Sequence, residues 1–422
     1  MTVKSSLTTN RLFAPPVLLL AVAIIFCVAG ANALGQTTSS QAVPAALPPE
    51  LIEIRGAGNE ALYNLDYATA REKFTELRDR LPRHPAGDLN LAVLVWMEHL
   101  YKTRRLQTTL YTQEGFYAGG TKSKEGDPVE AGVDKAFRDH MAQAKAKAQK
   151  LVDKAPNDPD ALYFLGAVYG VLAGYEASAG RKFMSALRNG SRCHELHQRA
   201  VKLRPDSYDA YLSIGLYNYV VGSLPGFVRF LVGVIGIRGD KEQGVRELRM
   251  AAEKGLYNQD DAAVMLLAVY QREGKPQEAL PLLEKLSAKY PRNYLVRLEM
   301  ASTLNRLGRA SDSCKIFESL LQDKSANAED LIRYQYGEAL AVNREYRRAA
   351  EQFVTVTRAA GADPDLVTWA FLRAGQSLDL GGHRDEAIEQ YRQVLARPNI
   401  YDSREQASRG LKKPFKEKAG AG

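Results

Sequence analysis

The chain has 422 residues, of which 45% are hydrophobic and 25% charged, as is usual for a soluble globular protein. Lys and Arg exceed Asp and Glu by only 57 to 49, and no basic stripe of the kind that reads nucleic acid is present. Two of the three cysteines, Cys193 and Cys314, lie beyond the N-terminal segment and are separated by several predicted helices, too far apart for a disulfide. Packing must therefore hold the fold together.

The N-terminus has the pattern of a secretory signal. Two basic residues precede an apolar run at 17–28, and an A-x-A cleavage pattern ends at Ala33. We expect residues 1–33 to be removed on export to the periplasm or the outside of the cell. An uncleaved segment that anchors the chain in a membrane is the alternative. Residues 34–49, rich in Ser, Thr, Ala and Pro, are expected to be a disordered linker.

From residue 50 onward the sequence repeats a pair of amphipathic helices. The plainest example is 260–293, where apolar residues at helical spacing flank a turn that contains Gly and Pro. Neither helix can bury its apolar stripe alone, so the pairs must stack. About eight antiparallel pairs are expected over 50–400, which predicts an all-α solenoid. Residues 401–422, rich in Lys, are expected to form a solvated basic tail.

The second, third and fourth pairs contain insertions. The second has a long polar, Gly-rich loop between its helices, and the third has an insertion at 171–190. The fourth contains 222–237, GSLPGFVRFLVGVIGI, whose only charge is Arg229. This segment is too short and broken to span a membrane. It is expected to fold against neighbouring helices and the first helix of the second pair. The alternative is an apolar surface that docks on a membrane surface or a membrane partner.

Seven pairs share a small residue at one position of the second helix, where it would let two helices approach closely. These residues are Ala70, Cys193, Gly244, Ala279, Ser313, Ala349 and Ala387. With Leu165-Gly166 and Tyr169 in the third pair, and Leu283, Leu286 and Pro291 in the fifth, they resemble the tetratricopeptide repeat. The resemblance implies a right-handed superhelix with a concave groove that binds a protein or peptide.

A second, weaker resemblance lies in the fourth pair. The run SLPGFVRFLVGVIGIRGDKEQGVREL is similar to the inclusion-body-clearance family of these repeat proteins, which includes proteins like tetratricopeptide repeat protein 39. The matching residues are Ser223, Leu224, Pro225, Gly236, Gly239, Asp240 and Gly244. This resemblance implies an interaction protein without a catalytic site.

The sequence offers little for catalysis. Cys193, His194 and His197 form its one metal-like cluster. The first and last of these would face inward on a repeat helix, so packing is their expected role. A metal-dependent enzyme is therefore the least favoured function. Neither a phosphate-binding loop nor a nucleophile elbow occurs. We expect no catalytic residue and no cofactor.

The first helix of each pair would line the groove at fixed repeat positions. Aromatic and arginine side chains there are favoured, because such residues dominate binding hot spots. The candidates are Tyr163, Tyr219, Arg272, Asn305, Arg306, Tyr334, Trp369 and Gln376. For each of them the alternative is packing along its own helix.

Overall fold

The computed structural model describes residues 45–416 except 104–105, 107–128, 180–181, 235, 257, 324–327 and 401. All regular structure within these residues is helical. The predicted signal at 1–33 and most of the predicted linker lie outside the described residues, so those predictions remain untested.

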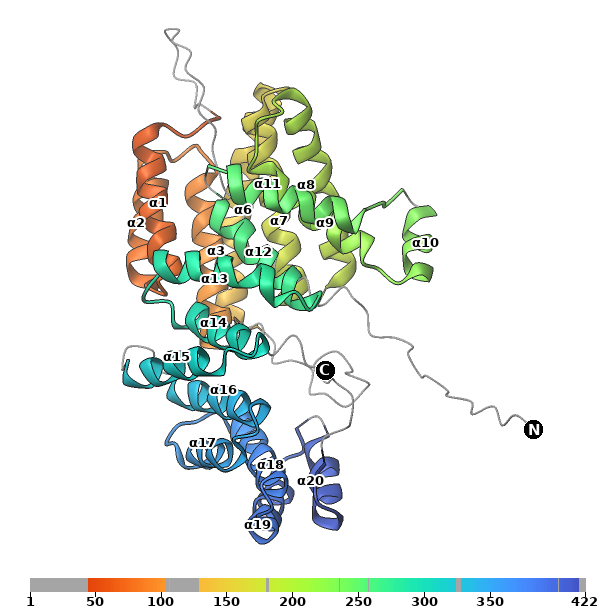
Figure 1. The fold of residues 1–422 in the computed structure, drawn as a ribbon. Coiled ribbons are helices and arrows are strands. Elements are labelled where there is room, and N and C mark those ends of the chain that lie inside the picture. Colours follow the sequence, from red (N-terminus) through yellow and green to blue (C-terminus); the bar gives the residue numbers. More distant parts are fainter. Residues whose placement is uncertain are drawn as a thin grey trace, which may run out of the picture.

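Within the described residues the helices form eight pairs and two single helices. The pairs are α1 (Pro49–Tyr63) with α2 (Tyr67–Arg80), α3 (Ala86–Lys102) with α6 (Ala131–Lys154), α7 (Pro159–Ser178) with α8 (Phe183–Leu203), α9 (Ala210–Gly222) with α11 (Lys241–Lys254), α12 (Gln259–Arg272) with α13 (Pro276–Lys289), α14 (Tyr294–Arg306) with α15 (Ala310–Gln322), α16 (Glu329–Val342) with α17 (Tyr346–Arg358), and α18 (Pro364–Leu380) with α19 (Arg384–Leu395). Helix α10 (Gly226–Val234) lies between α9 and α11 in the chain, and α20 (Ser403–Lys412) follows the last pair (Figure 1). The prediction of an all-α solenoid of about eight pairs is confirmed.

The turns inside the regular pairs require left-handed backbone. Gly274 (φ 65°), Gly308 (φ 74°) and Gly382 (φ 79°) follow the first helices of three pairs, and Arg344 (φ 63°) holds the same place in a fourth. Glycine adopts this conformation without strain, because it has no Cβ. Acidic and amide N-caps mark helix starts elsewhere: the Asn293 side chain, for example, accepts hydrogen bonds from the first turn of α14.

The predicted close-packing register is confirmed. All seven small residues of the second helices are buried. Glycines of the first helices lie opposite large side chains. A Cβ on Gly166 would lie 2.2 Å from His197 Cδ2, and one on Gly337 would lie 2.8 Å from Phe353 Cε1. The helices of a pair can therefore approach this closely only because the first helix has glycine at these points.

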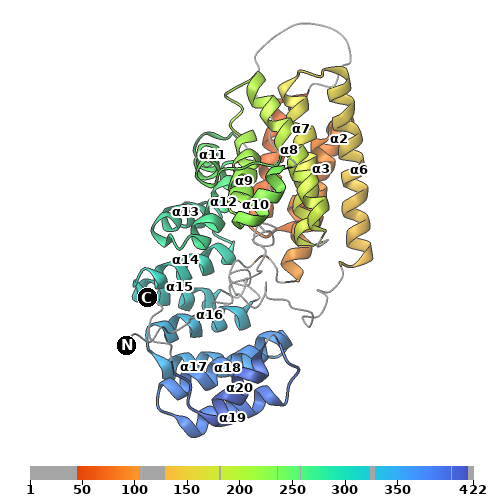
Figure 2. The same cartoon turned by 90° about the vertical axis from the view of Figure 1, so that its right-hand side faces the viewer.

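The insertion in the third pair lengthens its helices instead of forming a separate element. Helix α7 has 20 residues and α8 has 21, whereas α9 and α11 of the next pair have 13 and 14. Most of α7 is buried, because α3, α6 and α8 all pack against it. Figure 2 shows α7 inside this group of long helices.

The first pair closes against the fifth. The Tyr63 hydroxyl at the end of α1 donates to the Asp261 carboxylate of α12, and the Tyr63 ring stacks on Tyr290 with 4.6 Å between centroids. Asn293 Nδ2 donates to the Tyr63 carbonyl oxygen at 2.6 Å. One hydrophobic core runs through the described helices from α1 to α13 except α10. We call this part of the chain, with α10 attached to it, the body. Helices α14 to α20 continue from it as the arm (Figures 1 and 2).

The C-terminal segment is only partly a tail. Residues 403–412 form α20, which packs on α18 and α19 with Ser403 and Ala407 fully buried. The prediction of a solvated tail over 401–422 is therefore wrong for α20. The last repeat would otherwise expose its apolar face, and a capping element covers such a face in solenoids. Residues 417–422 lie outside the described part of the chain.

Candidate partner-binding surface

The first helices of the arm form its inner face. Helix α14 contacts α16, and α16 contacts α18, whereas α15, α17 and α19 contact one another less extensively. A stack whose first helices lie closer together than its second helices curves toward the first helices. We therefore call the side made by α14, α16 and α18 the inner face of the arm.

Two predicted groove residues lie inside the body. The Tyr163 hydroxyl accepts a hydrogen bond from Asn258 Nδ2 at 3.1 Å, and its ring stacks on His197 with 4.9 Å between centroids. The Tyr219 hydroxyl donates to Glu273 Oε1 at 2.8 Å. Both side chains are almost fully buried. They connect helices of the body, and a partner cannot reach them in this structure.

Arg272 lies at the end of α12 in the body. Its guanidinium lies over the Tyr219 ring, with Cζ 5.7 Å from the centroid, and the side chain is half-buried. Its Nη1 is buried without a hydrogen-bond partner among the described residues. Arg272 therefore packs on an aromatic ring while one of its donors stays unused.

Asn305 and Gln376 are buried in the arm. Asn305 Oδ1 accepts from Asn343 Nδ2 at 2.6 Å, which joins the ends of α14 and α16. Gln376 Oε1 accepts from Arg373 Nη1 at 2.7 Å, and its Nε2 donates to Gln406 Oε1 at 3.2 Å. These two amides hold neighbouring helices in register instead of facing an open surface.

Three predicted residues remain accessible in the arm. Arg306 is exposed, and within the described part of the chain no carboxylate pairs with it. Tyr334 is half-buried, with its ring edge-on to Phe353 at 5.3 Å between centroids. Trp369 is also half-buried. These side chains come from three successive first helices, so they are spread along the inner face.

The sequence interpretation missed Val342, which is 65% exposed at the end of α16. Val342 is the last residue of its first helix, as Arg272 is of α12 and Arg306 is of α14. Because both arginines are predicted groove residues, comparing the same position in the next repeat would have identified Val342. It also missed the bridge that fixes α16 to α18, where Arg373 Nε and Nη2 donate to the two Glu338 oxygens at 2.6 and 2.7 Å. That bidentate bond holds the face around Tyr334 in one geometry.

The metal-like cluster is built into the packing of α7, α8 and α9. His197 is fully buried, and its Nε2 lies 2.9 Å from the Tyr163 carbonyl oxygen. Its Nδ1 is occupied by Ser213 Oγ, with Cys193 Sγ at 3.8 Å. Burial lowers the pKa of His197 to about 4 and raises that of Cys193 to about 12, so both side chains are neutral near neutral pH. His194 instead stacks on Tyr217. The part of the chain that the structure describes contains no group of three or more candidate metal ligands.

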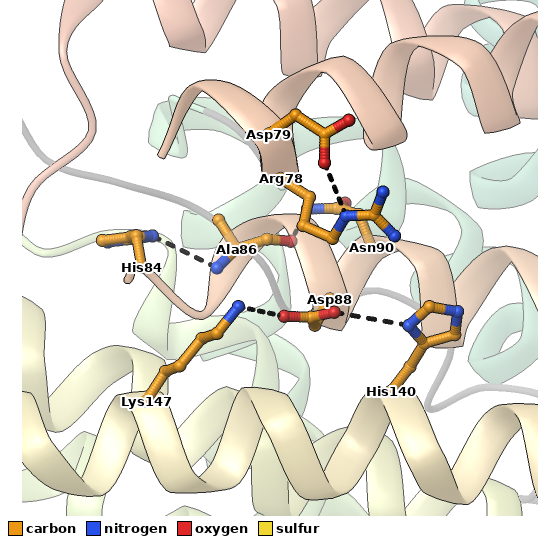
Figure 3. Close-up of polar contacts among 8 residues, drawn as sticks. All are labelled: Arg78, Asp79, His84, Ala86, Asp88, Asn90, His140 and Lys147. Atoms are coloured by element: carbon orange, nitrogen blue, oxygen red, sulfur yellow. Dashed lines mark hydrogen bonds and ion pairs between the residues drawn. The ribbon is translucent and has the colours of Figure 1, made fainter. Parts of the chain in front are cut away.

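A second polar cluster joins α3 to α6 in the body (Figure 3). The buried Asp88 carboxylate accepts from Lys147 Nζ on one oxygen, and His140 Nδ1 lies 3.4 Å from the other. Nearby, the Ala86 amide donates to His84 Nδ1, and His84 Nε2 lies 3.0 Å from the Ala45 carbonyl oxygen. Burial lowers the pKa of His84 to about 4, so this ring stays neutral. These contacts link α3 to α6 and to the segment before α1.

Known protein families match most of the second half of the chain. Residues 209–360 match the family model described as Iml2/Tetratricopeptide repeat protein 39, and residues 369–399 match the model of a tetratricopeptide repeat. The chain is a tetratricopeptide repeat protein. The first match covers α9 to α17, including the segment with the weaker sequence resemblance, and the second covers most of the last pair. Tetratricopeptide repeats bind peptides or proteins, so the chain is a protein-interaction scaffold.

Three solved structures align with parts of this chain at low sequence identity and low TM-score. YrrB, described as a TPR protein with an unusual peptide-binding site, is 16% identical, with a TM-score of 0.32 over 63% of this chain and 98% of its own. Pseudomonas aeruginosa PilF is 16% identical, with a TM-score of 0.36 over 60% and 97%. Yeast Tom70 is 12% identical, with a TM-score of 0.35 over 86% and 95%. No curated protein matches the chain.

Proposed function

We propose that this tetratricopeptide repeat protein is an exported scaffold that binds a protein or peptide on the inner face of its arm, without catalysis. One contrast supports the arm as the binding region. The predicted groove residues of the body, Tyr163 and Tyr219, are buried by its own helices. In the arm, Arg306, Tyr334 and Trp369 keep part of their surface open.

The chemistry of these side chains suits a binding site. Arginine and large aromatic residues supply most of the energy at protein interfaces when a partner excludes water from them. Arg306 can pair with a carboxylate of a partner, because within the described residues no acidic side chain already neutralises it. The Arg373–Glu338 and Asn305–Asn343 bonds hold the helices of the inner face in place before a partner binds. Binding therefore loses less conformational entropy.

Alanine variants test this surface. A partner isolated with the wild-type protein should bind roughly tenfold or more weakly to Arg306→Ala, Tyr334→Ala and Trp369→Ala, measured by titration with purified components. The matched control is Arg392→Ala in α19, an exposed arginine on a second helix, which should bind normally. Thermal melts check folding, because Tyr334 and Trp369 are half-buried. Normal binding by all three variants would show that the partner contacts another region, such as the predicted polar loop at 112–128.

Export is the second part of the proposal, and it rests on the pattern at 1–33. The mass and N-terminal sequence of the protein recovered from each cell fraction test it. A periplasmic or secreted chain that begins at Leu34 is the expected result. A full-length chain in the membrane fraction would show the uncleaved anchor instead. A full-length chain inside the cell would contradict export.

A further inference from the structure

Helix α10 carries an apolar stripe that none of the described helices covers. Phe227 is 71% exposed, Phe230 68%, Leu231 50% and Val234 72%. These residues are spaced i, i+3, i+4 and i+7, so they lie on one face of the helix. Figure 1 shows α10 projecting from the right-hand edge of the body. An apolar face that points into solvent marks an interaction surface.

The expectation that this insertion folds against neighbouring helices is wrong for these four side chains. It was expected to cover the long first helix of the second pair, which is α3. Helices α2, α6 and α7 already pack on α3 and bury most of it. No apolar surface is left there for α10, so its stripe stays outside.

The charged residues next to the stripe in sequence are basic, which favours contact with anionic groups. Arg229, the only charged residue of α10, donates from Nη1 to the Gly222 carbonyl oxygen at 3.1 Å. This bond turns the guanidinium toward the end of α9 and away from the stripe. No Asp or Glu occurs from 210 to 239, and Arg238 is exposed just beyond α10. The next acidic residue, Asp240, is the N-cap of α11 and accepts a hydrogen bond from the Gln243 amide. Negative groups can therefore approach the stripe without repulsion from the chain around it.

The shape and size of the stripe favour a lipid leaflet over a protein. From these exposed fractions and the usual areas of such side chains, the stripe offers roughly 500 Å². That is below the ~800 Å² per partner of a standard stable interface, which argues against a second copy of the chain as the occupant. A projecting helix also needs a groove on a protein partner, whereas lipid chains rearrange around it. Shallow insertion of apolar side chains beside cations is how interfacial helices bind membranes.

We propose that α10 inserts Phe227, Phe230, Leu231 and Val234 into one leaflet of an anionic phospholipid membrane and tethers the scaffold there reversibly. The helix has nine residues, about 14 Å in length, and it cannot cross a ~30 Å hydrocarbon core. Throughout the described residues no helix is both long and apolar enough to span a membrane. The contact is therefore peripheral. It goes beyond the proposed partner binding, since the arm stays free while α10 is in the lipid.

Vesicle co-sedimentation tests the proposal. The protein is the chain from Leu34 onward, which keeps every described residue and removes the apolar run at 17–28. It should bind vesicles of phosphatidylcholine with about 30% phosphatidylglycerol. The double variant Phe227→Ser/Phe230→Ser should bind roughly tenfold less, because its apolar face is shortened. The matched control Leu203→Ser/Leu256→Ser removes two leucines that are 48% and 58% exposed elsewhere in the body, and it should bind like the wild type.

Two further measurements separate the alternatives. Arg238→Gln should weaken binding to the anionic vesicles about threefold and leave binding to pure phosphatidylcholine unchanged. The fluorescence of Phe230→Trp should shift to shorter wavelength when anionic vesicles are added. No vesicle binding by the intact chain, or equal binding by Phe227→Ser/Phe230→Ser, overturns the proposal. A second result would also overturn it: light scattering shows that the wild-type chain is a dimer and that Phe227→Ser/Phe230→Ser is a monomer, while neither protein binds vesicles. Thermal melts of each variant exclude unfolding as the cause, and the arm variants described above should still bind vesicles.

Discussion

Replacing Gly244 by alanine should lower the free energy of unfolding by about 3 kcal/mol, because it overpacks the closest helix contact of the fourth pair. A Cβ at this position would lie 2.4 Å from the Tyr219 backbone nitrogen and 2.5 Å from the Gly215 carbonyl oxygen. Both atoms belong to the backbone of α9, so no side chain can rotate away. Helices α9 and α11 would have to separate, and the midpoint of urea unfolding reports the loss.

The matched control for this substitution is Gly190→Ala in α8. No atom lies within 4 Å of a Cβ at Gly190. The same chemical change should therefore stabilise the protein by up to about 1 kcal/mol, since alanine favours the helix. If Gly244→Ala lowers the free energy of unfolding and Gly190→Ala raises it, the close approach of α9 and α11 is the cause of the loss. If Gly244→Ala unfolds at the wild-type midpoint, α9 and α11 are not packed as the structure shows.

The second large effect is expected at Asp88. Asp88→Asn keeps the shape of the side chain but leaves Lys147, which is only 19% exposed, without its carboxylate partner. Removing one member of a buried ion pair costs about 3 kcal/mol, because the remaining charge is left without compensation. The change is measured by denaturant unfolding near neutral pH. Adding Lys147→Met to Asp88→Asn should recover part of the loss. Asp139→Asn, in the exposed pair with Lys135, should cost less than about 1 kcal/mol.

The pH dependence gives an independent check on Asp88. Burial by itself would raise the pKa of this carboxyl, but the bonds from His140 and Lys147 outweigh burial and hold the pKa below its usual 3.8. A lowered pKa in the folded state adds stability above pH 3.8, and this stability is lost as the pH falls through the folded value. The difference in unfolding free energy between wild type and Asp88→Asn should therefore shrink below that pH. A constant difference would show that the carboxylate charge is not what stabilises the α3–α6 contact.

The repeat fold followed from the sequence because its determinants are local. Helical spacing of apolar residues, and one small residue per second helix, are visible in any single pair. Ala279, Ser313 and Ala349 lie 34 to 36 residues apart, and all three are buried where the register places them. The exposure of Arg306 at the end of a first helix follows from the same position in the repeat.

The accessible part of the candidate site depended on contacts between distant segments. Tyr163 and Tyr219 occupy groove positions in the sequence, but they are buried in the body, and Asn258 and Glu273 fill their hydrogen bonds. The first pair closes on the fifth through Tyr63 and Asp261, which are 198 residues apart. A pattern within one repeat contains no information about how far the stack curves, because curvature depends on the packing of every pair between the two ends.

Helix α10 also combines a property that the sequence determined with one that depended on distant contacts. The sequence by itself determined that 222–237 is apolar, with one charge and too few residues to span a membrane. Whether Phe227 and Phe230 are buried depended on which surfaces the rest of the chain left uncovered. Helix α3 is already enclosed by α2, α6 and α7, so the tertiary structure leaves the stripe of α10 in solvent. Burial is a property of the whole packed assembly, since an apolar side chain is covered only when another element has free surface to place against it.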